Sequence, residues 1–221
     1  MSVASKGMAM FELIVGKPAL LVIDLQNDFV EPGMPGSAQG VHEIIPRIAR
    51  VIEAAKSAGI PVIYTQEAHR PGRVDSGREA DEGTGVSYGY PIDVPISEHT
   101  VEGTRGIEII DELAPERTDL RITKRRYSCF LGTDLDLLLR GLGVQTLLVT
   151  GIDANVCVLY TVADGFQLDY YVRVLEDCVA GTTPEEHEAA LLIMRNLTTG
   201  RRITSEDVLA QLKGMPVPAP M

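Results

Sequence analysis

Three residues far apart in the chain, Asp24, Lys124 and Cys157, are of the types that together can cleave an amide bond. A thiol attacks a carbonyl carbon as the thiolate, which a nearby cation or the N-terminus of a helix stabilises. Lys124 could supply the cation, and Asp24 could take the thiol proton and later return it to a leaving group. The three residues therefore predict a cysteine hydrolase if the fold brings them together.

Each of these residues also has a purely structural interpretation. A single cysteine at the start of a helix often packs as a small hydrophobic residue. Asp24 could cap a turn, and Lys124 could be the solvated end of a strand. The hydrolase interpretation therefore depends on whether the surrounding elements place all three side chains at one edge of a sheet.

Strand-like and helical segments alternate along most of the chain. Apolar runs predict strands at residues 19–25, 61–66, 120–124, 144–151 and 170–177, with a weak strand at 201–204. Helical patterns cover residues 41–58, 106–113, 133–141, 155–167 and 184–197, and a closing helix follows. This alternation predicts a doubly wound α/β fold with a mostly parallel sheet, whose site lies beyond the carboxyl ends of the strands. Asp24, Lys124 and Cys157 all follow or end such strands.

Residues 67–105 interrupt the alternation with a polar stretch that is rich in Gly and Pro. A loop of this length in a compact domain usually has a function, so we predict an active-site or interface loop. No linker or internal repeat divides the chain. Its length favours one domain over residues 1–221, with a core at about 17–212.

The bulk composition excludes several classes of partner. A formal net charge of -11 argues against binding to nucleic acid or to an anionic membrane. No apolar run approaches the roughly 20 residues that a membrane-spanning helix needs, and we expect a cytoplasmic protein. Cys129, Cys157 and Cys178 are scattered, which fits neither a disulfide framework nor a zinc ribbon.

Three collinear blocks resemble the isochorismatase-like cysteine hydrolases in order and spacing: LLVIDLQNDFVEPG, TKRRYSCFLGTDLDLLLRGLGVQTLLVTGI and NVCVLYTVADGFQLDYYVRVLEDC. The similarity extends from about Lys17 to Leu212. It implies that Asp24, Lys124 and Cys157 are the catalytic residues. It also implies a three-layer α/β/α fold with a six-stranded parallel sheet, assembled as a homodimer or a homotetramer.

The resemblance implies a particular backbone next to the nucleophile. A cis peptide at Ile152–Asp153 would aim the N–H groups of Asp153 and Cys157 at the oxyanion of a tetrahedral intermediate. Most members have a small residue or Thr followed by Thr here, whereas this chain has Asp153 and Ala154. Because a carboxylate would raise the pKa of the neighbouring thiol, we expect Asp153 to point away or to contact a cationic part of the substrate.

Members of this family hydrolyse small amides such as nicotinamide, N-carbamoylsarcosine, ureidoacrylate and biuret. The isochorismatases themselves lack the cysteine, so Cys157 favours amide hydrolysis through a thioester. EAHRP looks like biuret hydrolases, while KRRYSCF and TVADGFQLDYY look like ureidoacrylate amidohydrolases, and both groups act on a linear ureido or carbamoyl group. Such a small polar substrate needs fixed partners in the pocket. The candidates are Gln26, Glu67, His69, Arg70 and Tyr127.

Two alternatives to this function remain open. A nicotinamidase-like hydrolase of a cyclic amide would bind a metal, and Glu67 and His69 partly match the metal ligands of those enzymes. No second His follows them, so we predict no metal and no other cofactor. The chain could instead be a catalytically silent member that keeps the fold for binding. Arg70 could likewise be a solvated or intersubunit charge.

Overall fold

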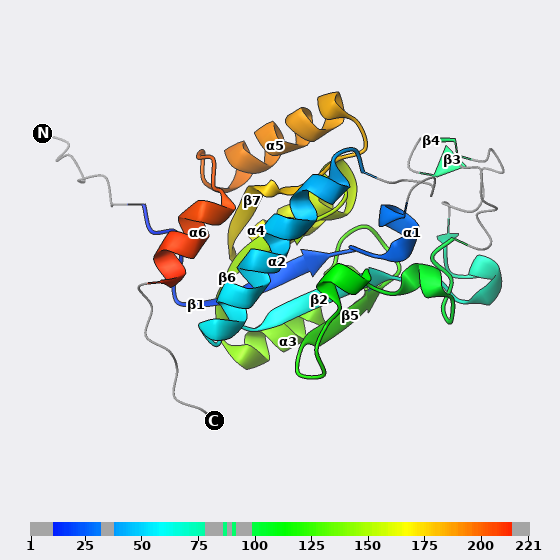
Figure 1. The fold of residues 1–221 in the computed structure, drawn as a ribbon, viewed down its shortest axis with the longest axis horizontal. Coiled ribbons are helices and arrows are strands. Elements are labelled where there is room, and N and C mark those ends of the chain that lie inside the picture. The colour runs from blue at the N-terminus through cyan, green and yellow to red at the C-terminus, as the bar shows by residue number, and fades with distance from the viewer. Residues whose placement is uncertain (1–10, 32–37, 78–85, 88–89, 92–98, 214–221) are drawn as a thin grey trace, which may run out of the picture.

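The computed structural model describes residues 11–31, 38–77, 86–87, 90–91 and 99–213. A parallel sheet with the strand order β5-β2-β1-β6-β7 lies at its centre (Figure 1). Its strands are β1 (Lys17–Ile23), β2 (Val62–Glu67), β5 (Leu120–Lys124), β6 (Val144–Gly151) and β7 (Tyr171–Val179). The chain therefore has the parallel α/β fold that the alternating pattern predicts.

The central strand β1 shows why the sheet must be covered on both faces. Every residue of β1 after Lys17 is buried. Leu20 and Val22 belong to one hydrophobic core, whereas Leu21 and Ile23 belong to a second one. Because successive side chains of a strand point to opposite faces, an unbroken apolar run requires a layer of helices on each side.

The helices form these two layers. The first core contains residues of α2 (Val41–Ser57) and α6 (Ser205–Leu212), and α2 crosses in front of the sheet in Figure 1. The second core contains residues of α3 (Leu135–Leu142), α4 (Leu159–Gln167) and α5 (Pro184–Thr198). Within the described residues, no helix combines the length and the apolar character that crossing a membrane requires.

Short elements gather beyond the carboxyl ends of the strands. They include α1 (Asn27–Val30), η1 (Pro71–Arg73), η3 (Arg105–Ile107) and the β-ribbon of β3 (Val86–Ser87) and β4 (Tyr90–Pro91). A further turn, η4 (Asp111–Leu113), packs against α2 instead. Figure 1 shows α1 and the β3–β4 pair at this end of the molecule. Much of the predicted loop at 67–105 lies outside the described residues, at 78–85, 88–89 and 92–98.

Two predicted elements differ in the structure. The expected helix at 106–113 consists of the separate turns η3 and η4, because residues 108–110 run alongside residues 25–27 and bond to their backbone. The weak strand at 201–204 is not formed, so the described sheet has five strands where six were expected. Only the Glu176 N–H bonds to Ile203 O there, and Thr204 instead caps α6 through a capping box.

Candidate active site

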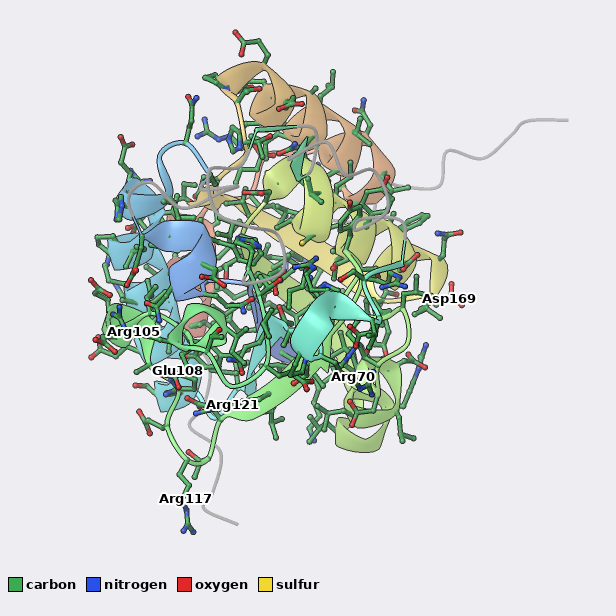
Figure 2. The ribbon with its side chains drawn as sticks, turned by 90° about the vertical axis from the view of Figure 1, so that its right-hand side faces the viewer. Arg70, Arg105, Glu108, Arg117, Arg121 and Asp169 are labelled. Carbon is green, nitrogen blue, oxygen red and sulfur yellow. The ribbon has the colours of Figure 1, made fainter. Side chains whose placement is uncertain are left out.

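The carboxyl ends of neighbouring strands position the candidate residues. Asp24 directly follows β1, while Glu67 and Lys124 are the last residues of β2 and β5 and stand opposite each other in the sheet. Cys157 lies in η5 (Ala154–Val158), a turn of π-helix that follows β6 and leads into α4. The site thus spans β5, β2, β1 and β6, and Figure 2 faces this end of the sheet.

The ammonium group of Lys124 is the centre of the site. Its Nζ lies 2.7 Å from Asp24 Oδ2, 2.9 Å from Glu67 Oε2 and 3.4 Å from Cys157 Sγ. All four side chains are buried. The structure therefore brings together Asp24, Lys124 and Cys157, which are more than 130 residues apart at the extremes.

Glu67 belongs to the same cluster, although the sequence suggested only a contact with substrate or a partial match to a metal ligand. The Cys157 thiol lies 3.9 Å from Glu67 Oε2, within hydrogen-bonding distance for sulfur. Glu67 Oε1 lies 3.4 Å from Nε2 of His69. Its position at the end of a strand beside β1 was the signal that could have placed it here.

Local backbone geometry fixes the two strands that carry Asp24 and the cysteine turn. Asp24 has a φ of 51°, a left-handed conformation that Asp tolerates better than most residues, and Thr65 Oγ1 donates to its Oδ1 at 2.6 Å. Gly151, with a φ of 112°, ends β6 beside Ile23. A Cβ atom at Gly151 would lie 2.1 Å from Ile23 O, so only glycine permits this close approach.

Burial and charge set the protonation of the site. Burial by itself would lower the pKa of Lys124, but Asp24, Cys157 and Glu67 outweigh it and hold that pKa well above its ordinary value. Burial raises the pKa of Asp24 despite the neighbouring ammonium. Burial also raises the pKa of the Cys157 thiol well above 9.0, with Lys124 opposing it and the carboxylates adding to it. The thiol is therefore protonated at neutral pH and must lose its proton to react.

The turn before the cysteine has the backbone that an anion site needs. The Ile152–Asp153 peptide bond is cis, at the position that the family resemblance implies. The carbonyl oxygen of Asp153 accepts the N–H groups of Val156 and Val158 at 3.0 and 3.1 Å, which closes the turn. This turn carries the N–H groups of Asp153 and Cys157 into the start of a helix, where backbone N–H groups favour negative charge.

The side chain of Asp153 does not point away from the thiol, contrary to one of the two expectations. It is 6% exposed and lines a small pocket together with Asp24, Phe29, Ile152 and Cys157. Burial, and then the charges of Asp24 and Glu67, raise the pKa of Asp153 well above its ordinary value. A third carboxyl group therefore faces the nucleophile.

Comparison with known proteins identifies the family of this chain. A family model described as the isochorismatase domain matches residues 18–207. The chain belongs to the isochorismatase family. The ureidoacrylate amidohydrolase RutB of Methylobacterium radiotolerans is 37% identical to it over 182 residues, which cover 78% of this chain and 70% of that protein.

Two further proteins are similar to this chain over most of its length. A probable inactive nicotinamidase of Arabidopsis thaliana is 37% identical over 181 residues, covering 81% of this chain and 88% of that protein. The crystal structure of a cysteine hydrolase from Pseudomonas syringae pv. phaseolicola has a TM-score of 0.81 at 25% identity and covers 94% of this chain and all of that one. The comparisons thus match both the fold and most of the length of the chain.

The proposed substrate ligands of this isochorismatase-family protein lie in different surroundings. Gln26 is fully buried, and its amide bonds to the N–H and C=O of Glu67 and to Ile107 O, so it has no polar atom left for a substrate. His69 is also fully buried, between Glu67 and Asp75. Both side chains thus contact other groups of the protein in this structure.

Arg70 and Tyr127 lie further out. The Arg70 side chain is 58% exposed, pairs with Asp75 at 2.9 Å, and stands on the face shown in Figure 2. Tyr127 is half-buried, with its ring 5.6 Å from that of Tyr160. Burial would raise the pKa of Asp75, but hydrogen bonds from Arg125, Arg70 and His69 outweigh it and lower the pKa to about 2. Arg70 thus belongs to a charged network around Asp75.

A metal ion does not fit between Asp24, Glu67 and Cys157. Asp24, Glu67 and Cys157 offer ligand atoms that lie within 4.8 Å of one another. The Lys124 ammonium, however, stands between these same three side chains, at 2.7 to 3.4 Å from each. A cation would have to displace this ammonium from its partners.

Proposed function

We propose that this isochorismatase-family protein is a cysteine amidohydrolase that cleaves a small ureido, carbamoyl or related amide through a thioester. The chain is a hydrolase of carbon–nitrogen bonds other than peptide bonds, the class of its amidohydrolase relatives. One observation carries the finer proposal. The Lys124 ammonium contacts both the carboxyl group of Asp24 and the thiol of Cys157 in a buried cluster.

The first half of the reaction forms the thioester. Asp24, whose pKa burial raises, takes the proton of Cys157 as the sulfur attacks the carbonyl carbon. Lys124 stabilises the developing thiolate, and the N–H groups of Asp153 and Cys157 donate hydrogen bonds to the oxyanion. When the C–N bond breaks, Asp24 returns the proton to the leaving nitrogen, which departs as ammonia or an amine.

The second half regenerates the thiol. Asp24 takes a proton from a water molecule, and the resulting hydroxide attacks the thioester carbonyl. The same backbone N–H groups stabilise the second tetrahedral intermediate. The C–S bond then breaks, the acid product leaves, and the sulfur regains its proton from Asp24. One carboxyl group therefore serves as the base and as the acid in both halves.

Release of ammonia from a panel of small amides, ureides and carbamoyl compounds tests the proposal. We expect turnover of at least one linear ureido or carbamoyl compound. Cys157→Ser and Asp24→Asn should each lower kcat by at least about 100-fold, because a positioned acid–base group contributes on the order of 10²–10⁴. Both variants should keep the far-UV circular dichroism of the wild type. An active Cys157→Ala variant would show that the nucleophile has been misassigned.

The two alternative functions give different results in the same assays. A metal-dependent hydrolase of a cyclic amide would lose activity with a chelator and contain a metal by elemental analysis. A silent member, like the relative described as a probable inactive nicotinamidase, would release no ammonia from any compound. Insensitivity to chelators together with turnover of a linear ureide supports the cysteine amidohydrolase over both.

A further inference from the structure

Asp153 is the one carboxyl group in the pocket that the reaction above leaves without a side-chain role. Asp153 is only 6% exposed, and it lines the pocket next to Cys157. Within the part of the chain that the structure describes, its Oδ1 has no hydrogen-bond partner. Burial of a carboxyl oxygen without a hydrogen bond destabilises the fold, because the oxygen gives up its bonds to water and forms none within the protein. A substrate group that donates a hydrogen bond would supply the partner that Asp153 Oδ1 lacks.

The backbone holds Asp153 in this position. Its carbonyl oxygen closes the turn by accepting the N–H groups of Val156 and Val158, and the next residue, Ala154, donates to Ala180 O at 2.8 Å. The turn is thus tied both to η5 and to the segment after β7. The carboxyl group therefore belongs to a fixed wall of the pocket, which suits a residue that selects its ligand.

The charges around the pocket indicate which ligand group fits. Asp24 and Glu67 pair with the ammonium of Lys124, and all three groups influence the pKa of the Asp153 carboxyl. Two guanidinium groups, those of Arg73 and Arg125, are engaged elsewhere. Arg73 donates to His99 O and Thr100 Oγ1, and Arg125 pairs with Asp75 and Glu102.

An incoming cation would favour the ionised form of Asp153, which burial and its acidic neighbours now disfavour. The overall charge of -11 attracts cations over a longer range. A ligand carboxylate would instead make ionisation of Asp153 still less favourable.

We propose that Asp153 selects amide substrates that carry a positively charged nitrogen group close to the scissile carbonyl. This inference rests on the proposed amidohydrolase function and names its substrate class. A protonated amine or a guanidinium would donate hydrogen bonds to Asp153 Oδ1 and pair with its charge. An anionic ureide, the kind that gives the Methylobacterium relative its name, would place a carboxylate in the same acidic pocket.

Three ureides of nearly equal shape test the proposal. N-(2-aminoethyl)urea ends in an ammonium, N-propylurea ends in a methyl group, and 3-ureidopropionate ends in a carboxylate. Binding is measured by calorimetry on the Cys157→Ser protein, which keeps the pocket but lacks the nucleophile. We expect the cationic ureide to bind at least about tenfold more tightly than the neutral one, as a charge-assisted hydrogen bond would give, and the anionic one to bind most weakly.

Asp153→Asn in the same background should remove the preference for the cation and leave binding of N-propylurea within about threefold. Asp134→Asn is the matched control, because it removes one negative charge from an exposed residue at the start of α3 and should change none of the three affinities. Circular dichroism verifies that each variant folds. Any fold defect of Asp153→Asn would weaken all three ureides together, whereas loss of selectivity would affect only the charged ones.

The outcomes separate this inference from the function on which it rests. A preference for the cation that depends on Asp153, without turnover of any ureide by the wild type, would refute the amidohydrolase and keep the selectivity. Turnover of ureides without a preference for the cation would support the amidohydrolase and refute the selectivity of Asp153. Failure of N-(2-aminoethyl)urea to bind at millimolar concentration, or a preference that survives Asp153→Asn, would overturn the role of Asp153.

Discussion

Replacement of Lys124 by Met would test whether the ammonium holds the acidic site together. Lys124 Nζ is buried and contacts Asp24 and Glu67 at 2.7 and 2.9 Å. Loss of one partner of a buried ion pair typically costs about 3–5 kcal/mol, because the other charge is left without compensation. We therefore expect Lys124→Met to lower the free energy of unfolding by about this amount at pH 7.

The pH dependence of the free energy of unfolding of Lys124→Met is a more specific test. Burial raises the pKa of Asp24, and Lys124 is the main influence that opposes the rise, so the pKa climbs further in Lys124→Met. The folded variant then binds a proton that the unfolded chain releases above its ordinary pKa of 3.8. The stability from this proton is fully present below pH 3.8 and is lost as pH rises toward the folded pKa. Its loss amounts to about 1.4 kcal/mol for each pH unit.

Urea unfolding followed by far-UV circular dichroism at pH 5, 6, 7 and 8 measures this slope; the chain has no Trp for fluorescence. Arg50→Met is the matched control, since it also removes the cation of an ion pair, here with Glu206 at 2.9 Å. Both side chains are more than half exposed, so we expect a cost of about 1 kcal/mol or less and no added slope. The reasoning fails if Lys124→Met matches this control in cost and in pH dependence.

Three further predictions concern the residues around the nucleophile. Glu67→Gln should keep the fold and lower kcat by about tenfold or more, because it removes an anion from both Lys124 and the thiol; unchanged steady-state kinetics would limit Glu67 to a structural role. Alkylation of Cys157 by iodoacetamide should accelerate as pH rises, with a midpoint above 9.0, and Asp153→Asn should lower that midpoint by removing a like charge. A midpoint near neutral pH would contradict the protonated thiol. Gly151→Ala should lower the yield of folded protein or cost more than about 3 kcal/mol in urea unfolding, because its Cβ would overlap Ile23 O.

Local sequence patterns were sufficient to predict the elements that carry Asp24, Lys124 and Cys157. An apolar run buried on both faces has few alternatives to a central parallel strand, and the edge at which such strands end follows from their direction. The helix predicted at 106–113 failed for a reason that no local pattern contains. Residues 108–110 pair with residues 25–27, and this long-range contact outweighs helix propensity.

The surroundings of individual side chains were harder to predict. Gln26 and His69 carry polar groups of the kind that bind substrates, and only the packing shows that other parts of the protein already occupy them. The orientation of the Asp153 side chain likewise depends on the hydrogen bonds that hold the turn between β6 and η5. A family resemblance locates such a turn in the chain, but an unusual residue within it has no precedent from which to infer its orientation.

The side chain of Gln26 also fixes the relative position of β1 and β2 at the site. Its side-chain amide accepts from the N–H of Glu67 and donates to its C=O, as a peptide group in an adjacent strand would. The pairing of β1 with β2 is thereby extended past the point where the main chain of β1 turns aside. A shift of β2 along β1 by one residue would break both bonds at once. The spacing between the Asp24 and Glu67 carboxyl groups is therefore set by a side chain that imitates the backbone, and loops can vary around it without altering that spacing.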